Sequence, residues 1–476
     1  MPEETLGSRR GQLAIFYLVS IALALGLFAA IAWMGEAWFV TPDAPLAPRT
    51  DGQMHGQLNT LLHVLLALAV VIVTARTLGA LFKFLQQPPV IGEVLGGIML
   101  GPSLLGYFAP GAYLYILPPA AAPFLGVISQ LGVILYMFVV GLELDLKVLR
   151  SSGHATLAIS HASIIAPFLL GAGLALMIYE SFAPDGVAFT PFALFLGVSM
   201  SITAFPVLAR ILSDRRIQRT RMGIIALTCA AVDDVTAWCL LAFVVSVTQA
   251  TLGAAFMTLL LTLVYIAAMF IVVRPLVVRV VPLLEKVDRV SEGGLAIIFV
   301  ALLLSALATE LIGIHAIFGA FLLGAITPHD SRVAHDVTNR LEDLVRVMFL
   351  PAFFAFTGMR TQISLLSGLD HWLICLAIIG VATLGKFGGT FLAARLAGLQ
   401  TRDASALGIL MNTRGLVELI VLNIGFDLGI ITPTLFTMLV VMALVTTFMT
   451  TPILHAITRK HPWATEPAGA NAGAVA

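Results

Sequence analysis

The sequence predicts an all-α integral membrane protein whose helices form an inverted repeat with two interrupted helices. The first observation is composition: 59% of the 476 residues are hydrophobic, 11% are charged, and the mean hydropathy is +1.01. These values lie far outside the range of soluble domains and require many membrane-spanning segments. The second observation is an internal repeat. The third is a pair of aspartates inside an apolar segment.

An extra apolar run, from about Leu13 to Trp33, precedes the main body of the chain and follows Arg9 and Arg10. A signal peptide has the same order of charges, but its apolar region is usually shorter, so we expect a retained helix. Thirteen further apolar segments follow a polar connector, and we expect each to form a helix. They lie at about 57–81, 88–107, 121–143, 153–178, 190–212, 221–247, 252–281, 293–312, 314–328, 341–360, 369–396, 403–427 and 432–456.

The positive charges predict the orientation in the membrane. If the first core helix starts outside, nearly all lysines and arginines of the loops fall on the cytoplasmic side, and only Arg49 and Arg360 fall on the other. The asymmetry predicts fourteen helices with both termini in the cytoplasm. The expected location is a bacterial inner membrane or a plasma membrane. Lys386 and Arg414 are exceptions because they lie within apolar segments.

Three pairs of segments match each other in the same order along the chain. They are EVLGGIMLG of 93–101 with AIFGAFLLG of 316–324, GLELDLKVL from Gly141 with GMRTQISLL from Gly358, and LGVSMSITAFPVLARIL from Leu196 with LGILMNTRGLVELIVLN from Leu407. Such self-similarity indicates a duplication. The copies are seven helices apart. Because seven is odd, they cross the bilayer in opposite directions, which is the inverted repeat typical of secondary transporters.

Two of the matched segments contain signals that interrupt a helix. Pro206 removes a backbone donor in the middle of the fifth core segment. At the same depth of the twelfth, residues 412–415 place polar side chains and a glycine. If both segments unwind, the freed carbonyls and amides meet in a polar cavity. The alternatives are a simple proline kink and, in the second segment, a self-neutralising pair of Arg414 and Glu418.

Asp233 and Asp234 lie within an apolar run from Gly223 to Val247. Ionised groups at mid-membrane depth are costly, so we expect a functional role rather than purely structural hydrogen bonds. Side chains of adjacent helical residues point about 100° apart, so the two aspartates face different neighbours. Lys386 needs a counter-charge if it is buried, and an aspartate is the obvious partner. The alternative is that it extends to the cytoplasmic surface.

The expected chemistry is the exchange of a cation for a proton. A desolvated carboxylate holds a proton near neutral pH and releases it when a small hard cation arrives. Hydroxyl and carbonyl oxygens suit Na⁺, Li⁺ or K⁺. The sequence has no metal-ligand cluster, nucleotide-binding loop or nucleophile triad, and its three cysteines lie in apolar runs without metal-type spacing. No enzyme activity, cofactor or nucleic-acid partner is therefore expected.

The chain resembles the monovalent cation/proton antiporter-2 family, especially the plant cation/H⁺ exchangers and the bacterial Kef-like and Nap-type branches. The shared motifs, in order between about residues 57 and 456, are QPPVIGEVLGGIMLGPS, FVVGLELD, SITAFPVLARIL, AAVDDVTAW, GIHAIFGAFLLG and MNTRGLVELIVLNIG. The resemblance implies the sodium/proton antiporter fold. It also implies a homodimer and an elevator motion of a core domain against a dimerisation domain.

The same resemblance implies roles for individual residues. Asp234 would bind the monovalent cation or the proton, Asp233 would pair with Lys386, and Thr203 would line the site. Further candidates that match family motifs or lie in the interrupted segments are Ser201, Asn412, Thr413, Arg414, Glu418, Glu93, Glu143 and His315. Many plant exchangers carry Asn-Asp where this chain has Asp-Asp, and Asp-Asp with an intramembrane lysine resembles the electrogenic sodium/proton members. Cation identity and stoichiometry therefore stay open.

The predicted function is antiport of Na⁺ or K⁺ with protons across a lipid bilayer. The predicted parts are an N-terminal helix with an external connector (1–56), dimerisation helices (57–150), core ion-transport helices (151–250), a linker helix (251–292), dimerisation helices of the second repeat (293–368), core helices of the second repeat (369–458) and a cytoplasmic tail (459–476). A passive cation channel, or a symporter of an organic or anionic solute on a related fold, are the alternatives. Transport against a gradient would exclude the channel, and an acidic pair beside a lysine is a poor match to an anion site.

Overall fold

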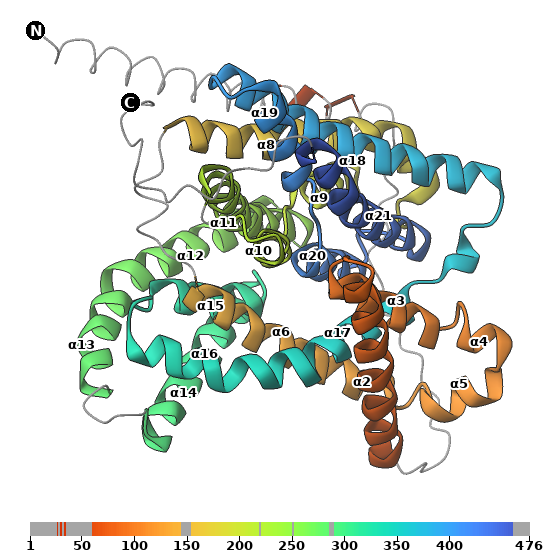
Figure 1. Cartoon of the computed structure of the whole chain (residues 1–476). Coiled ribbons are helices and arrows are strands. Elements are labelled where there is room, and N and C mark those ends of the chain that lie inside the picture. Colours follow the sequence, from red (N-terminus) through yellow and green to blue (C-terminus); the bar gives the residue numbers. More distant parts are fainter. Residues whose placement is uncertain are drawn as a thin grey trace, which may run out of the picture. The chain divides into compact units, whose positions relative to one another are not determined.

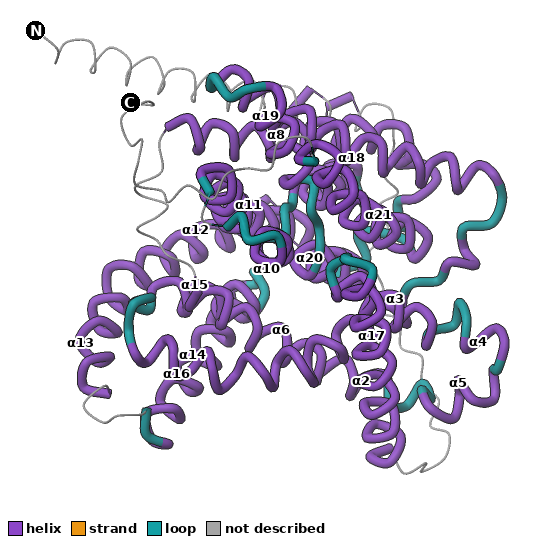
Figure 2. Tube along the Cα trace, in the orientation of Figure 1, coloured by secondary structure: helices purple, strands orange, loops and turns teal. Residues whose placement is uncertain are grey.

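The computed structural model describes residues 60–143, 154–218, 220–249, 252–284 and 290–459, together with Gly26, Ala29, Ala30, Trp33 and Met34. In these ranges all regular structure is helical and no strand occurs (Figure 2). Ten helices in this part of the chain are long and apolar enough to cross a membrane, or eleven if one bent helix pair counts as a span. The predicted all-α membrane fold is confirmed. The connector at 35–56 and almost all of the N-terminal helix and C-terminal tail lie outside the described residues.

The helices coincide with the thirteen predicted core segments, but two of these segments do not have the length and composition of a span. The segment predicted at 314–328 is the eleven-residue helix α15 (Ala316–Ile326). The one predicted at 341–360 continues a polar helix: α16 (Arg332–Leu344) runs into the π-helical turn η2 (Val345–Phe349) and then into α17 (Leu350–Arg360). The count of fourteen spans therefore stays a prediction.

The described helices form two compact units. Unit 1 contains the described residues of 1–48, 151–237 and 366–476, and unit 2 those of 49–150 and 238–365. The unit boundaries after residues 150 and 365 lie close to the predicted boundaries at 150 and 368. The boundary after residue 237 differs from the prediction, in which the core ion-transport helices of the first repeat continue to residue 250. Ion transport by one unit and dimerisation by the other remain predictions.

Unit 1 is built from helices of both predicted repeats. They are α8 (His154–Phe182), α9 (Phe189–Ser201), α10 (Phe205–Asp214), the first part of α11 (Arg221–Gln249), α18 (Leu369–Leu396), α19 (Thr401–Met411), α20 (Leu416–Asp427) and α21 (Pro433–Thr458). Helix α8 packs along α18 and against α9, while α18 also packs against α19 and α21 (Figure 1).

Glycines of α18 allow its close approach to α8. A Cβ atom at Gly385 would lie 2.6 Å from the Cα of Pro167, and one at Gly389 would lie 2.7 Å from the carbonyl oxygen of Ala162. Glycines four residues apart on one face let two helix backbones pack closely in a membrane. The contact holds α18, which carries Lys386, firmly against α8.

Both predicted helix interruptions occur. Helix α9 ends at Ser201, the backbone of Ile202 and Ala204 is extended, and α10 begins at Phe205. Pro206 falls in the first turn of α10, where its missing N–H costs no helical hydrogen bond. In the second repeat, α19 ends at Met411, α20 begins after Gly415, and the two halves are bent by 44°. The first interruption is therefore a true break rather than a proline kink.

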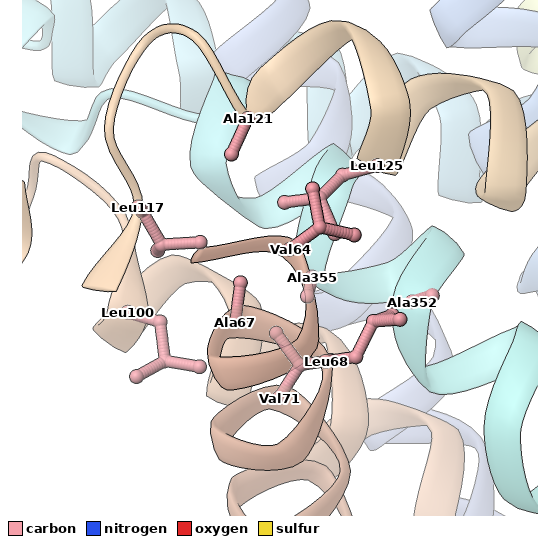
Figure 3. Packing of buried hydrophobic residues seen from close by; sticks show 10 residues of the cluster. All are labelled: Val64, Ala67, Leu68, Val71, Leu100, Leu117, Ala121, Leu125, Ala352 and Ala355. Carbon is pink, nitrogen blue, oxygen red and sulfur yellow. The ribbon is translucent and has the colours of Figure 1, made fainter. Parts of the chain in front are cut away.

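Unit 2 contains α15, α16, η2, α17 and the remaining helices. The latter are α2 (Thr60–Phe84), α3 (Pro89–Leu100), α4 (Leu105–Phe108), α5 (Pro110–Ile116), α6 (Ala122–Glu143), α12 (Leu252–Ala268), η1 (Met269–Val273), α13 (Arg274–Leu284), α14 (Glu292–Ile312) and η3 (Ile363–Leu365). Figure 3 shows a buried apolar cluster that joins α2, α3, α6 and α17. Its residues are Val64, Ala67, Leu68, Val71, Leu100, Leu117, Ala121, Leu125, Ala352 and Ala355.

Two helix contacts in unit 2 repeat each other. In the predicted duplication, Gly101 is equivalent to Gly324, and Gly141 to Gly358. A Cβ at Gly101 would lie 3.1 Å from the carbonyl oxygen of Gly358, and a Cβ at Gly324 would lie 2.9 Å from the Cα of Gly141. Such reciprocal contacts are expected when two copies are related by a two-fold axis. The packing therefore agrees with an inverted repeat.

Candidate functional site

The buried acidic and basic side chains of the described chain gather in unit 1. Among the described residues, five Asp, Glu, Lys or Arg side chains are buried: Asp233, Asp234, Lys386, Arg414 and Glu418. They come from α11, from α18, and from the second helix break and the α20 that follows it. Four of the five have no exposed surface, and Asp234 is 3% exposed. Charges withdrawn from water this completely need specific partners.

Asp233 is surrounded by hydrogen-bond donors. Its Oδ1 accepts from Ser160 Oγ at 2.6 Å. Its Oδ2 accepts from Ser163 Oγ at 2.8 Å, from Thr203 Oγ1 at 2.9 Å and from Lys386 Nζ at 2.9 Å. A buried ion pair is tolerated only when further hydrogen bonds satisfy its remaining lone pairs, and Asp233 has them. Both oxygens of this carboxylate are thus occupied.

Thr203 connects Asp233 to the second break. Its Oγ1 lies 2.9 Å from Asp233 Oδ2 and 3.0 Å from the carbonyl oxygen of Met411. A hydroxyl has one proton, so it donates to one of these acceptors at a time. The backbone adds a second connection, because the N–H of Ala204 donates to the carbonyl of Thr413 at 3.0 Å. The two interrupted helices therefore bond directly to each other at their breaks.

Asp234 has a different environment from its neighbour. Its carboxylate accepts a hydrogen bond from the backbone N–H of Phe205, the first residue of α10. The start of a helix favours a negative charge because its amides are unpaired and its dipole is positive there. The other oxygen, Oδ1, is buried and has no hydrogen-bond partner within the described protein. Of the two aspartates, Asp234 is therefore the one with an open oxygen.

Arg414 caps the C-terminal end of α9. Its NH1 donates to the carbonyl of Ser199 at 2.7 Å and its NH2 to that of Met200 at 2.6 Å. Carbonyls in the last turn of a helix have no partner inside the helix, and a cation there is favoured by the helix dipole. NH1 also lies 2.9 Å from Glu418 Oε2, in a fully buried ion pair. The predicted i, i+4 pair is therefore present, but Arg414 also bonds to the other repeat.

The two breaks cap each other in an equivalent way. The sequence match pairs Met200 with Met411 and Thr203 with Arg414. Thr203 Oγ1 lies 3.0 Å from the carbonyl oxygen of Met411, and Arg414 donates to the carbonyl of Met200. Each side chain thus contacts the end of the half-helix in the other copy. This reciprocity is the arrangement that two copies related by a two-fold axis produce.

The remaining predicted residues have other surroundings. Ser201 Oγ bonds to the carbonyls of Gly197 and Ile164, at 2.7 Å and 3.0 Å. The side chains of Asn412 and Thr413 are fully buried in the second break, and their polar atoms have no hydrogen-bond partner within the described protein. Glu93, Glu143 and His315 belong to unit 2, whereas the five buried charges belong to unit 1.

Ser160 and Ser163 are part of the site although the sequence analysis did not single them out. They lie three residues apart in α8, on one face of the helix. This spacing of two hydroxyls in a membrane helix was the signal that could have revealed them. Nothing in the sequence, however, indicated that this face of α8 contacts α11.

A membrane bundle in which two interrupted helices meet around buried charges defines a protein of the secondary-transporter class. A family model described as "Sodium/hydrogen exchanger, transmembrane" matches residues 64–460. The chain is 44% identical over 398 residues to the Na(+)/H(+) antiporter NhaS4 of Synechocystis, which covers 83% of this chain and 97% of that protein. It belongs to the sodium/hydrogen exchanger family, and the predicted resemblance is confirmed.

Two more distant comparisons agree. Cation/H(+) antiporter 17 of Arabidopsis thaliana is 39% identical over 425 residues, which is 88% of this chain but only 51% of the plant protein. The chain thus spans about half the length of this relative. Among solved structures, the sodium proton antiporter MjNhaP1 of Methanocaldococcus jannaschii matches with a TM-score of 0.52 and 17% identity, over 84% of this chain and 97% of that one. At this identity the match shows the shared fold.

Proposed function

We propose that the protein exchanges a monovalent cation, Na⁺ or K⁺, for protons, and that the two compete for Asp234. The observation that carries the proposal is the charge balance of the five buried residues. Asp233 pairs with Lys386 and Glu418 pairs with Arg414, each at 2.9 Å. Asp234 is left without a counter-charge. A buried carboxylate in this position needs one positive charge, which either a proton or a monovalent cation supplies.

The geometry around Asp234 supports the same site. Its Oδ1 has no donor within the described protein, whereas both oxygens of Asp233 are occupied. Carboxylate, hydroxyl and carbonyl oxygens are the ligands that Na⁺, K⁺ and Li⁺ prefer. The Synechocystis relative is named a Na(+)/H(+) antiporter, which supports Na⁺ as a substrate, and the plant relative is named a cation/H(+) antiporter.

We further propose that unit 1 carries the ion across the membrane by an elevator motion relative to unit 2, and that unit 2 holds two copies together as a homodimer. All five buried charges belong to unit 1, which supports its role as the moving part. In this arrangement Asp233, Lys386 and Thr203 keep the two helix breaks and α18 bonded to α11 while Asp234 exchanges its ion. Both termini are proposed to lie in the cytoplasm.

The proposal is tested by dye-reported proton movement in proteoliposomes after addition of Na⁺, K⁺ or Li⁺. In wild type an imposed cation gradient should drive protons in the opposite direction, and in Asp234→Asn it should not. Asp370→Asn is the matched control because Asp370 is an exposed residue at the start of α18 in the same unit. Exchange by Asp234→Asn at the wild-type rate would overturn the site. Cation flux without proton movement would instead support a channel.

A further inference from the structure

Glu418 is the buried carboxylate that the proposed exchange at Asp234 does not use. It lies in the first turn of α20 and is completely buried. Its Oε2 accepts from Arg414 NH1 at 2.9 Å. Its Oε1 has no hydrogen-bond partner within the described protein. One oxygen of this carboxylate thus accepts a hydrogen bond and the other has no partner, as in Asp234.

The contact between Arg414 and Glu418 is not the one that a static ion pair would be expected to have. Strong arginine–carboxylate pairs use two parallel hydrogen bonds to both oxygens. Here only Oε2 takes part, and the Nε of Arg414 has no partner within the described protein. The guanidinium instead donates to the carbonyls of Ser199 and Met200. Its position is therefore set largely by the end of α9.

A proton on Glu418 would leave these contacts intact. If it binds at Oε1, Oε2 remains a carbonyl oxygen that accepts from Arg414. Arg414 would then keep two backbone carbonyls and the negative end of the α9 dipole as compensation for its charge. Removing the negative charge of Glu418 therefore does not leave an isolated buried cation.

The surroundings of Glu418 contain few other charges. Arg414 and Lys386 are the charged groups that act on it, and Lys386 is itself paired with Asp233. Helices α9 and α21 pack against α20. Helix α9 has no ionisable side chain, and α21 has only His455, in its last turn. Among the described charged groups, Arg414 and Lys386 therefore set the charge environment of Glu418.

We propose that Glu418 is a second proton-binding site, next to the second helix break and separate from Asp234. The proposal rests on the proposed antiport and adds to it. With all five groups ionised the buried cluster has one excess negative charge, which a proton on either Glu418 or Asp234 neutralises. When a cation occupies Asp234 the excess is removed, and Glu418 releases its proton because a buried cluster with a net positive charge is unfavourable.

Infrared difference spectroscopy tests this directly. Protein with ¹³C-labelled glutamate side-chain carboxyls is perfused with Na⁺ and with choline at one pH. The label separates glutamate from aspartate bands without any substitution. We expect Na⁺ to cause the loss of a protonated-carboxyl band that shifts with the glutamate label. The band should be absent from Glu418→Gln, and in Glu418→Asp it should lose its sensitivity to the label.

The outcomes separate this proposal from the proposed function. If Na⁺ removes an aspartate band but no glutamate band, exchange at Asp234 stands and Glu418 is only a structural partner of Arg414. If a glutamate band responds equally in Glu418→Gln, another residue binds the proton and the assignment is wrong. If no carboxyl band responds to Na⁺, both proposals fail. If Glu418→Gln does not fold, Glu418→Asp assigns the band through its loss of label sensitivity, and the absence of any glutamate band in labelled wild type overturns the proposal without a variant.

Discussion

Lys386 Nζ lies 2.9 Å from Asp233 Oδ2, and neither side chain has any exposed surface. The pair joins α18 to α11, so it links the helices of the two repeats inside unit 1. Because Ser160, Ser163 and Thr203 also donate to Asp233, the ion pair is embedded in a full set of hydrogen bonds. This structural role distinguishes Asp233 from its neighbour Asp234.

Loss of Lys386 should destabilise unit 1 strongly. Lys386→Met leaves Asp233 as an uncompensated buried charge, which costs about 3 to 5 kcal/mol of folding free energy. The double variant Asp233→Asn/Lys386→Met removes both charges and should recover most of this loss. Thermal unfolding in detergent, followed by circular dichroism, measures the effect. A single variant as stable as wild type would show that the pair does not hold the helices together.

The two neighbouring aspartates should respond oppositely to the same substitution. Asp233→Asn leaves Lys386 unpaired and should lower the melting temperature. Asp234→Asn removes a carboxylate that has no counter-charge, so its melting temperature should equal or exceed that of wild type. The variants are matched controls for each other because they change adjacent residues of one helix. Equal destabilisation by both would contradict the assigned difference.

The glycines of α18 provide a test of the packing that positions Lys386. Gly385→Ala would place a Cβ 2.6 Å from the Cα of Pro167, and overpacking of this kind costs about 1 to 3 kcal/mol. Gly388→Ala is the control, because a Cβ there meets no atom within 4 Å. Only the first substitution should lower the melting temperature and the transport rate. Comparable effects of the two would mean that the close contact with α8 is not required.

The contribution of Thr203 to stability and transport should depend on its hydroxyl group rather than on its shape. Thr203→Val keeps the volume but removes the donor shared by Asp233 and the carbonyl of Met411, and an unsatisfied buried acceptor costs about 1 to 3 kcal/mol. Thr203→Ser keeps the donor and should behave much like wild type. Cation-driven proton movement and melting temperature are compared for both. If valine is tolerated as well as serine, the hydrogen bond between the breaks is dispensable.

Much of the fold followed from local signals in the sequence. Pro206 and the polar segment 412–415 marked both breaks correctly because they alter the backbone itself. The segment at 314–328 was apolar enough to be read as a span, but its regular helix is the eleven-residue α15, since composition does not fix where a helix begins and ends.

The contacts of the site were less predictable. The aspartates, Lys386 and the Arg414–Glu418 pair stood out because charges are rare in apolar segments. Their partners depend on how distant helices pack: Ser163 is 70 residues from Asp233, and Ser199 is 215 residues from Arg414. A sequence shows the spacing along each helix but not the rotation of one helix against another, so these contacts could not be derived from it.

The central claim is that a proton and a cation compete for Asp234. Calorimetric titration of the purified protein with Na⁺ at a series of pH values tests it most directly. At low pH the proton occupies the carboxylate, so the apparent dissociation constant should rise by about tenfold for each unit of decreasing pH and become constant at high pH. Asp234→Asn should show no such pH-dependent binding. A wild-type affinity that does not change with pH, or an Asp234→Asn protein with the wild-type profile, would contradict the account.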